Sequence, residues 1–365
     1  MKNTLRCQSC HKEYSPTAPR WNCTCGGLLN LDFHARFPLS KINRRKPTLW
    51  RYREALPIDH DCHIISFDEG FTPLIQEELY GKKVLLKQDH LFPSGSYKDR
   101  GASVLVSKLK ELGVTEVVED SSGNAGAAIA AYCAKAAIDC HIYVPKKTSP
   151  EKLVQITRYG AYLHTINGDR DDTALAALKH AQTTYYASHY WNPFFFHGTK
   201  TAIFEIIEQL GWKSPDILIV PVGNGTLLYG NFIGLMELRH EGIIKKLPKI
   251  IGVQAENCAP LADAWSNRDD HHPHTIVKET IAEGIAIPNP LRAKDILQSI
   301  KETNGDIVTV SEKEILDSLY CIRKKGYYIE PTSAVGIAGF KKLHTKDDDC
   351  VVIPLTGHGL KTSKI

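Results

Sequence analysis

The sequence predicts an α/β protein of two lobes, each built on parallel-type strands covered by helices, with a small N-terminal extension. From about residue 60 onward, short continuous apolar runs alternate with amphipathic helical stretches, which is typical of parallel sheets covered on both faces. A length of 365 residues favours two lobes over one core. The runs expected as strands are Val84–Leu86, Val117–Asp120, His141–Pro145, Tyr162–Ile166, Ile217–Val222, Ile250–Val253 and Cys350–Pro354.

Composition and charge argue against several classes of partner. The 42% apolar and 24% charged content is that of an ordinary globular protein, and a net charge of +4 is weak for this length. The basic run 41–46 is short, so no nucleic-acid partner is expected. No apolar segment approaches ~20 residues and none follows Met1, so neither a membrane span nor a secretion signal is expected.

Ten cysteines in a chain of this length do not indicate a disulfide scaffold. Most of those beyond the N-terminal region lie scattered in apolar or mixed runs, as free thiols do, and this predicts a reducing cytoplasmic location. They are Cys133, Cys140, Cys258, Cys321 and Cys350. The polar stretch 267–274, with His271, His272 and His274, is expected to be a surface loop rather than a metal site.

The first 34 residues carry a separate signal. Cys7-x-x-Cys10 and Cys23-x-Cys25 are separated by a twelve-residue polar loop, and Gly26-Gly27 follows the second pair. Two thiol knuckles of this kind can form a tetrahedral four-thiolate zinc site, which would be structural because no ligand position stays open. The alternative is a module that has lost its metal and retains four reduced cysteines.

Lys98 lies in the run Phe92-Pro-Ser-Gly-Ser-Tyr-Lys-Asp-Arg-Gly101, which delivers it to the start of a helix expected over Asp99–Leu112. At that point the helix dipole and Arg100 favour an uncharged amine, the form that attacks an aldehyde. Alone, such a lysine is more often a solvated surface residue. Its interpretation therefore depends on three further segments.

Each further segment follows an expected strand. Ser121-Ser122-Gly123-Asn124-Ala125-Gly126 precedes a helix expected over Ala127–Lys135 and suits a carboxylate, because backbone amides and hydroxyls meet at a helix N-terminus. Gly223-Asn224-Gly225-Thr226 opens another helix and suits a phosphate. Thr356 and His358 lie on a glycine-rich loop after the last strand, at the edge where ligands of open α/β sheets bind. Each could also be an ordinary turn.

Together these segments resemble fold-type II pyridoxal-phosphate (PLP) enzymes of the tryptophan synthase β superfamily, and most of all the threonine synthases. The matching segments span roughly residues 65 to 361 and also include Glu69–Leu74, Gly198–Thr201, Gly252–Ala255 and Glu330–Ala334. The cysteine-rich N-terminus resembles the ribbon of some threonine synthase-like proteins. The resemblance implies a small-molecule amino-acid substrate and a homodimer.

The resemblance also implies roles for individual residues. Lys98 would hold the cofactor covalently as an imine and move the proton at the substrate Cα. Asn124 would bond the ring oxygen of the cofactor, and Thr356 would face its pyridine nitrogen. Gly223, Asn224, Gly225 and Thr226 would hold its phosphate, while Ser121, Ser122 and Ala125 would bind the substrate carboxylate. A hydroxyl at the pyridine nitrogen makes the ring a weaker electron sink and favours elimination or replacement over transamination.

One position departs from the family pattern. Threonine synthases usually carry an arginine in an Asn-Pro-aromatic-Arg stretch, and here Phe195 stands at that position. An aromatic ring does not reproduce a guanidinium–phosphate pair. The expected function is therefore threonine synthase, acting on O-phosphohomoserine and water. The alternatives are β-replacement or β-elimination on serine, threonine, O-phosphoserine or a related amino acid, and a non-catalytic PLP-binding regulatory protein.

The resemblance divides the chain by function into three domains. Residues 1–34 would form the zinc-ribbon-like extension, 35–102 with 193–365 the large PLP-binding domain, and 103–192 the small substrate-carboxylate domain.

Overall fold

The computed structural model describes residues 3–268 and 278–362, and the histidines of the predicted loop 267–274 lie outside the described residues. The chain forms two compact units, Met1–Gly70 with Lys98–Thr199 and Phe71–Tyr97 with Lys200–Ile365. Among the described residues, no helix is long and apolar enough to cross a membrane. Both units contain parallel strands and helices, which confirms the predicted α/β class. The predicted division by function, with boundaries after residues 34, 102 and 192, stays a prediction.

The first unit begins with a three-stranded antiparallel sheet of order β2-β1-β3. Its strands are β1 (Thr4–Cys7), β2 (Glu13–Tyr14) and β3 (Leu29–Asp32). Leu5 and Leu29 are fully buried in the same hydrophobic cluster as the helices of this unit. Trp21 adds edge-on ring contacts to Tyr186 and Trp191, with centroids 5.1 and 5.4 Å apart. The cysteine-rich segment is therefore part of the packed core of the first unit.

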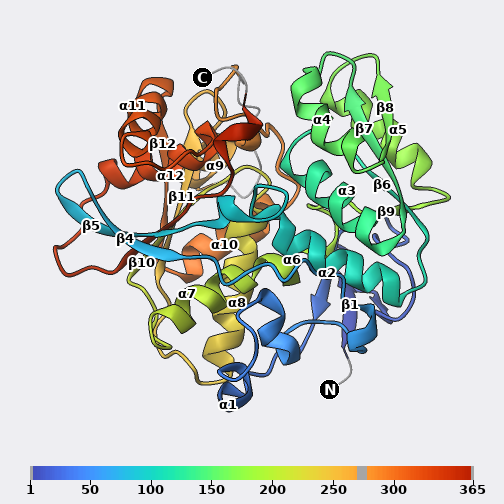
Figure 1. Ribbon diagram of the computed structural model, residues 1–365, viewed down its shortest axis with the longest axis horizontal. Helices are drawn as coiled ribbons and strands as arrows, with labels where there is room; N and C mark the ends of the chain where they lie inside the picture. Colours follow the sequence, from blue (N-terminus) through green and yellow to red (C-terminus); the bar gives the residue numbers. More distant parts are fainter. Residues whose placement is uncertain (1–2, 269–277, 363–365) are drawn as a thin grey trace. The chain divides into compact units, whose positions relative to one another are not determined.

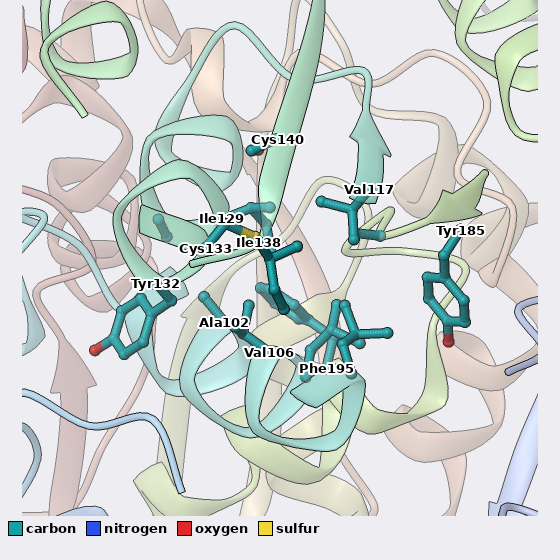
Figure 2. Packing of buried hydrophobic residues seen from close by; sticks show 14 of the residues in the cluster. Ala102, Val106, Val117, Ile129, Tyr132, Cys133, Ile138, Cys140, Tyr185 and Phe195 are labelled. Carbon is teal, nitrogen blue, oxygen red and sulfur yellow. The ribbon is translucent and has the colours of Figure 1, made fainter. Parts of the chain in front are cut away.

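A four-stranded parallel sheet of order β8-β7-β6-β9 forms the centre of this unit. The strands are β6 (Glu116–Glu119), β7 (Asp139–Pro145), β8 (Tyr162–Ile166) and β9 (Tyr185–Tyr186). Neighbouring residues of β6 lie in different clusters: Val117 packs with α3 (Asn124–Ala136) and Val118 with α5 (Arg170–His180). Because successive strand side chains point to opposite faces, α3 and α5 cover opposite faces of the sheet. Figure 2 shows the cluster around Val117.

Helix α2 (Lys98–Glu111) packs against α3 and against α6 (Pro193–Thr199). The approach to α6 is close, because a Cβ at Gly101 would lie 2.3 Å from a ring carbon of Phe195. Only glycine fits there while the ring keeps its place. The remaining helical segments of the unit are α1 (Leu39–Ile42), α4 (Pro150–Arg158) and the 3₁₀ turns Leu49–Ala55 and Asp61–His63.

The second unit is built on a six-stranded sheet of order β12-β11-β10-β13-β5-β4. All neighbours are parallel except β4 and β5, which form the hairpin drawn in light blue in Figure 1. The strands are β4 (Leu74–Leu79), β5 (Lys82–Lys87), β10 (Ile217–Pro221), β11 (Lys249–Ala255), β12 (Asp306–Val310) and β13 (Val351–Pro354).

Six helices accompany this sheet, and they are labelled in Figure 1 where there is room. They are α7 (Thr201–Gln209), α8 (Thr226–His240), α9 (Pro260–Asn267), α10 (Ala293–Glu302), α11 (Glu312–Arg323) and α12 (Pro331–Lys342). Short 3₁₀ turns cover Asp89–Leu91, Glu283–Ile285 and Gly359–Lys361. Helices α11 and α12 share one hydrophobic cluster with Ile219, Val253 and Ile353 of the central strands. This packing fixes the strands whose ends carry the candidate site.

Every apolar run expected as a strand lies in one of the two parallel sheets, with ends that differ by at most a few residues. Two expected helices begin earlier than predicted. α3 begins at Asn124 rather than Ala127, so Asn124 and Ala125 lie in its first turn, and α2 begins at Lys98 itself. In the two larger sheets, the strands β4, β9 and β12 were not predicted. All three are edge strands: β4 and β12 have partly polar faces and lack a continuous apolar run, and β9 has only two residues.

Candidate functional site

The topology of the second unit brings three of the predicted segments to one edge of its sheet. Strands β10, β13 and β5 are neighbours and run parallel, with Leu218 paired with Val352 and Val352 paired with Leu85. Their carboxyl ends therefore meet at the same edge. The loop after β10 contains Gly223–Gly225, the loop after β13 contains Thr356, and the segment after β5 runs to Tyr97.

Tyr97 links these loops through two contacts. Its backbone N–H donates to the carbonyl oxygen of Thr356 over 3.0 Å, and its hydroxyl lies 2.7 Å from Oγ1 of Thr226. Ser96 pairs with Gly357 in an isolated antiparallel bridge. The second unit thus brings the Gly223–Thr226 loop and the Thr356 loop together. Lys98 follows Tyr97 directly in the chain and is half-buried.

The loop 223–226 is shaped by two glycines. Gly225 has a φ of +73°, and a Cβ there would lie 2.2 Å from Cδ1 of Ile296. A Cβ at Gly223 would lie 2.8 Å from Cα of Ile285. Gly225 is the N-cap of α8 and, because it has no side chain, it makes no side-chain capping bond. Because the first N–H groups of a helix have no partner inside it, this terminus suits an anion.

Thr356 is 3% exposed and lies within a small hydroxyl network. Its Oγ1 is 3.0 Å from Oγ of Ser333, and that oxygen accepts from the N–H of Gly357 over 2.8 Å. The sequence did not predict Ser333 as a site residue, although it lies in Glu330–Ala334, one of the segments that match the family. Both oxygens are neutral groups, so the geometry offers a hydroxyl rather than a carboxylate at this position.

Beside Lys98, the oxygen Oγ of Ser96 is buried and has no hydrogen-bond partner among the residues described. A buried hydroxyl without a partner costs free energy of folding and indicates a polar group that completes the site. The donor set at this edge, with a helix N-terminus and several hydroxyls, fits the phosphate and the ring nitrogen of PLP. Lys98, the residue that follows Tyr97 in the chain, carries an amine of the kind that bonds its aldehyde.

In the first unit, the segment 121–125 lies at the carboxyl end of β6. Ser121, Ser122 and Asn124 are half-buried, and Ala125 is buried at the start of α3. The loop lies close over the helix, since a Cβ at Gly126 would be 1.9 Å from the carbonyl oxygen of Ser121. Only glycine allows this approach. The loop therefore lies over the first turn of α3, and its role in binding a carboxylate stays a prediction.

The same sheet edge carries two acids that sequence reasoning missed, the buried Glu119 and the half-buried Asp120. Strand order reverses between β6 and β9, and the residues after these strands meet there. Glu119 Oε1 is 2.8 Å from Nδ1 of His189, and the Tyr190 hydroxyl donates to Asp120 over 2.9 Å. Burial raises the pKa of Glu119 and of Asp120 and lowers the pKa of His189. The neutral forms of these groups are favoured.

Phe195 offers no charge to a substrate phosphate, because its side chain is an uncharged ring. That ring is fully buried against Gly101 and the His189 ring. In the second unit, the buried amine of Lys200 lies 2.7 Å from Oε1 of Glu237. Burial raises the pKa of Glu237 to about 7, and Lys200 opposes that rise. Neither the Phe195 position nor Lys200, which is engaged with Glu237, replaces the missing arginine.

The four N-terminal cysteines form a cluster whose sulfur atoms all lie within 4.8 Å of one another. Neighbouring sulfurs are 3.6 Å apart for Cys7 and Cys25, 3.4 Å for Cys10 and Cys23, and 3.5 Å for Cys25 and Cys10. Tetrahedral Zn–S bonds of 2.3 Å require sulfur separations of about 3.8 Å. The backbone N–H of Cys25 and the Tyr14 hydroxyl lower the pKa of the Cys23 thiol to about 5.

Comparison with known proteins decides the family. The model of the family described as pyridoxal-phosphate dependent enzyme matches residues 65–357. The chain belongs to this family. Curated relatives named threonine synthase are 37% identical in Methanocaldococcus jannaschii and 35% identical in Methanosarcina acetivorans, each over 98% of this chain and 92% of the relative. The chain is thus a threonine synthase-like PLP-dependent enzyme, as the sequence motifs predict.

Solved structures confirm the fold-type II architecture. A serine racemase from Dictyostelium discoideum matches with a TM-score of 0.66 at 25% identity, covering 79% of this chain and 92% of that one. A maize serine racemase matches with the same TM-score at 21% identity, over 79% and 88%. At this level of identity the second match shows the fold alone.

Proposed function

We propose that the chain is a threonine synthase that converts O-phosphohomoserine and water to threonine and phosphate. The observation that carries the proposal is the meeting of the loops after β5, β10 and β13 at one sheet edge, with Tyr97 bonded to both other loops. The relatives named threonine synthase support this choice of reaction within the family.

In this proposal, each predicted residue has a defined task, and Lys98 has two. The N-terminus of α8, with Gly223, Asn224, Gly225 and Thr226, binds the cofactor phosphate. Thr356 faces the pyridine nitrogen, and Lys98 binds the cofactor aldehyde covalently. When bound, the cofactor supplies an electron sink that acidifies the substrate Cα–H.

Lys98 also serves as the acid and base of the reaction. Its amine takes the proton from the substrate Cα and returns a proton later, which requires a group next to the cofactor. Ser121, Ser122 and the N–H of Ala125 bind the substrate carboxylate, and Asn124 donates to the cofactor ring oxygen. In the proposed reaction, Cα and Cβ would each lose a proton, the Cγ–O bond would break to release phosphate, and Cγ would gain a proton. Water would then add its hydroxyl at Cβ while a proton returns to Cα. The small-molecule partner is therefore an amino acid.

The buried position of Phe195 favours a second candidate function. Without an arginine there, β-replacement or β-elimination on serine, threonine, O-phosphoserine or a related amino acid is the competing assignment. These substrates need no cation pair for a γ-phosphate.

The test is an assay of the PLP-loaded chain with each candidate substrate. We expect O-phosphohomoserine to give threonine and inorganic phosphate in equal amounts, at a higher kcat/KM than for serine, threonine or O-phosphoserine. Turnover of one of those three amino acids, with no phosphate released from O-phosphohomoserine, would replace the first function by the second.

We also propose that Cys7, Cys10, Cys23 and Cys25 hold one structural Zn²⁺ ion, which the sulfur separations support. Metal analysis of chain purified without added metal is expected to give about one zinc per chain, because four thiolates close the coordination sphere. Cys10→Ser should lower that content, whereas Cys62→Ser, at an exposed thiol outside the cluster, should not. Fully reduced wild-type chain without zinc would end this proposal.

Two further assignments follow the family resemblance. We propose a cytoplasmic location, supported by cysteines that are all free thiols, since disulfides are uncommon in reducing compartments. We propose a homodimer as the assembly, as for fold-type II relatives.

A further inference from the structure

Tyr97 makes contacts on both sides of the candidate cofactor site. Its phenol reaches the first residue of α8, where Thr226 is 1% exposed, and its backbone N–H is bonded to the Thr356 carbonyl oxygen. All three residues belong to the second unit. Tyr97 is also the residue directly before Lys98, so it connects the anion-binding helix end to the candidate reactive amine through the chain.

The chemistry of the two hydroxyls favours one direction for their hydrogen bond. Each hydroxyl has one proton to donate and two lone pairs that accept. A phenol is a stronger acid than an aliphatic alcohol, which favours the Tyr97 O–H as donor and Oγ1 of Thr226 as acceptor. Thr226 then has its own proton to donate onward, and a hydroxyl that accepts one hydrogen bond is polarised into a better donor.

The phosphate of the cofactor is the group that would accept this proton. Gly225, the N-cap of α8, has no side chain, and Thr226 is the first side chain at that helix end. An anion bound by the helix N–H groups therefore lies beside the Thr226 hydroxyl. A hydroxyl donating to a charged oxygen forms a stronger hydrogen bond than one between neutral groups.

We propose that Tyr97 is a positioning residue for the cofactor phosphate, acting through Thr226. Its phenol directs the Thr226 hydroxyl onto the phosphate, and its backbone ties that phosphate site to Lys98. This inference rests on the proposed PLP site and adds a residue to which the motifs assign no role. The Tyr97 phenol would affect the binding of the cofactor phosphate and of no other group of the cofactor. A cofactor analogue without the phosphate therefore provides a specific test.

The test compares PLP with pyridoxal, which has the same ring and aldehyde but no phosphate. Cofactor-stripped full-length chain is titrated with each compound, and binding is followed by absorbance. Tyr97→Phe is expected to raise the Kd of PLP about three- to tenfold, the effect of one hydrogen bond. The Kd of pyridoxal should stay unchanged. Tyr80→Phe is the matched control, because it removes a tyrosine hydroxyl 3.0 Å from Oγ of Ser318 outside the site.

A second pair of variants tests the route through Thr226. Thr226→Val should weaken PLP binding, and Thr226→Ser should restore it because the hydroxyl returns. In the Thr226→Val background, Tyr97→Phe should add no further loss of PLP affinity. Thr226→Val with wild-type PLP affinity would overturn the proposal, whether or not the Tyr97 variant folds.

Other outcomes would also decide the matter. Unchanged PLP affinity in Tyr97→Phe would overturn the proposal, and so would an equal loss for PLP and pyridoxal, which would assign the effect to the lysine or the fold. Failure of the unaltered chain to bind PLP would instead overturn the proposed function. The two failures are therefore distinguishable.

Discussion

Lys98→Ala is expected to abolish covalent cofactor binding and to lower kcat by at least about 10²- to 10⁴-fold, the contribution of a positioned acid–base group. The loss follows from one amine serving both tasks. Lys98 is the half-buried first residue of α2, and alanine is a strong helix former, so the fold should persist. Absorbance spectra and steady-state kinetics measure the two effects, and circular dichroism checks the fold.

Lys83→Ala is the matched control, since Lys83 is an exposed lysine on β5. It should leave both the cofactor spectrum and kcat at wild-type values. Normal activity in Lys98→Ala, or an unchanged cofactor absorbance, would show that another residue holds the cofactor.

Gly225→Asp is expected to weaken PLP binding on the order of a hundredfold or more. The substitution places a carboxylate at the helix end that binds the phosphate, and like charges a few ångströms apart repel strongly in a partly buried site. It also adds a Cβ that would lie 2.2 Å from Ile296 Cδ1, in a backbone with φ of +73°. PLP titration of the cofactor-stripped variant measures the effect.

Two controls separate the charge from the backbone strain. Gly242→Asp places an aspartate in a similar backbone conformation, with φ of +71° and no atom within 4 Å of the new Cβ. It therefore shows how much the strain of that conformation, without a steric contact, changes PLP affinity. Gly225→Asn has nearly the shape of Asp without its charge. If Gly225→Asp and Gly225→Asn bind PLP equally well, the phosphate does not lie at this helix end.

Much of the fold follows from local patterns that the sequence displays openly. The strands β10, β11 and β13 are mostly apolar and almost entirely buried, which is the pattern of central strands covered on both faces. Two glycines allow close contacts that a side chain would block. At Gly126 the carbonyl of Ser121 lies over α3, and at Gly225 the side chain of Ile296 lies against the loop before α8. Local chemistry of this kind can be recognised without knowledge of the tertiary structure.

Contacts between distant segments could not be predicted in this way. The bond from Tyr97 to Thr226 joins residues 129 positions apart and depends on β5 and β10 flanking β13. The Glu119–His189 pair arises where strand order reverses between β6 and β9. Its only sequence signal is an acidic residue at the end of a strand whose centre is apolar. Similarly, nothing local indicates that Leu5 and Leu29 share a core with α2 and α3.

The central claim is that PLP is bonded to the side-chain nitrogen of Lys98, and peptide mapping after borohydride reduction tests it most directly. Reduction makes the bond permanent, so proteolysis and mass spectrometry can locate the phosphopyridoxyl group. We predict that it is found on the peptide containing Lys98 and, in fragment spectra, on that lysine. A modified lysine elsewhere, or no modified peptide from PLP-loaded chain, would contradict the account.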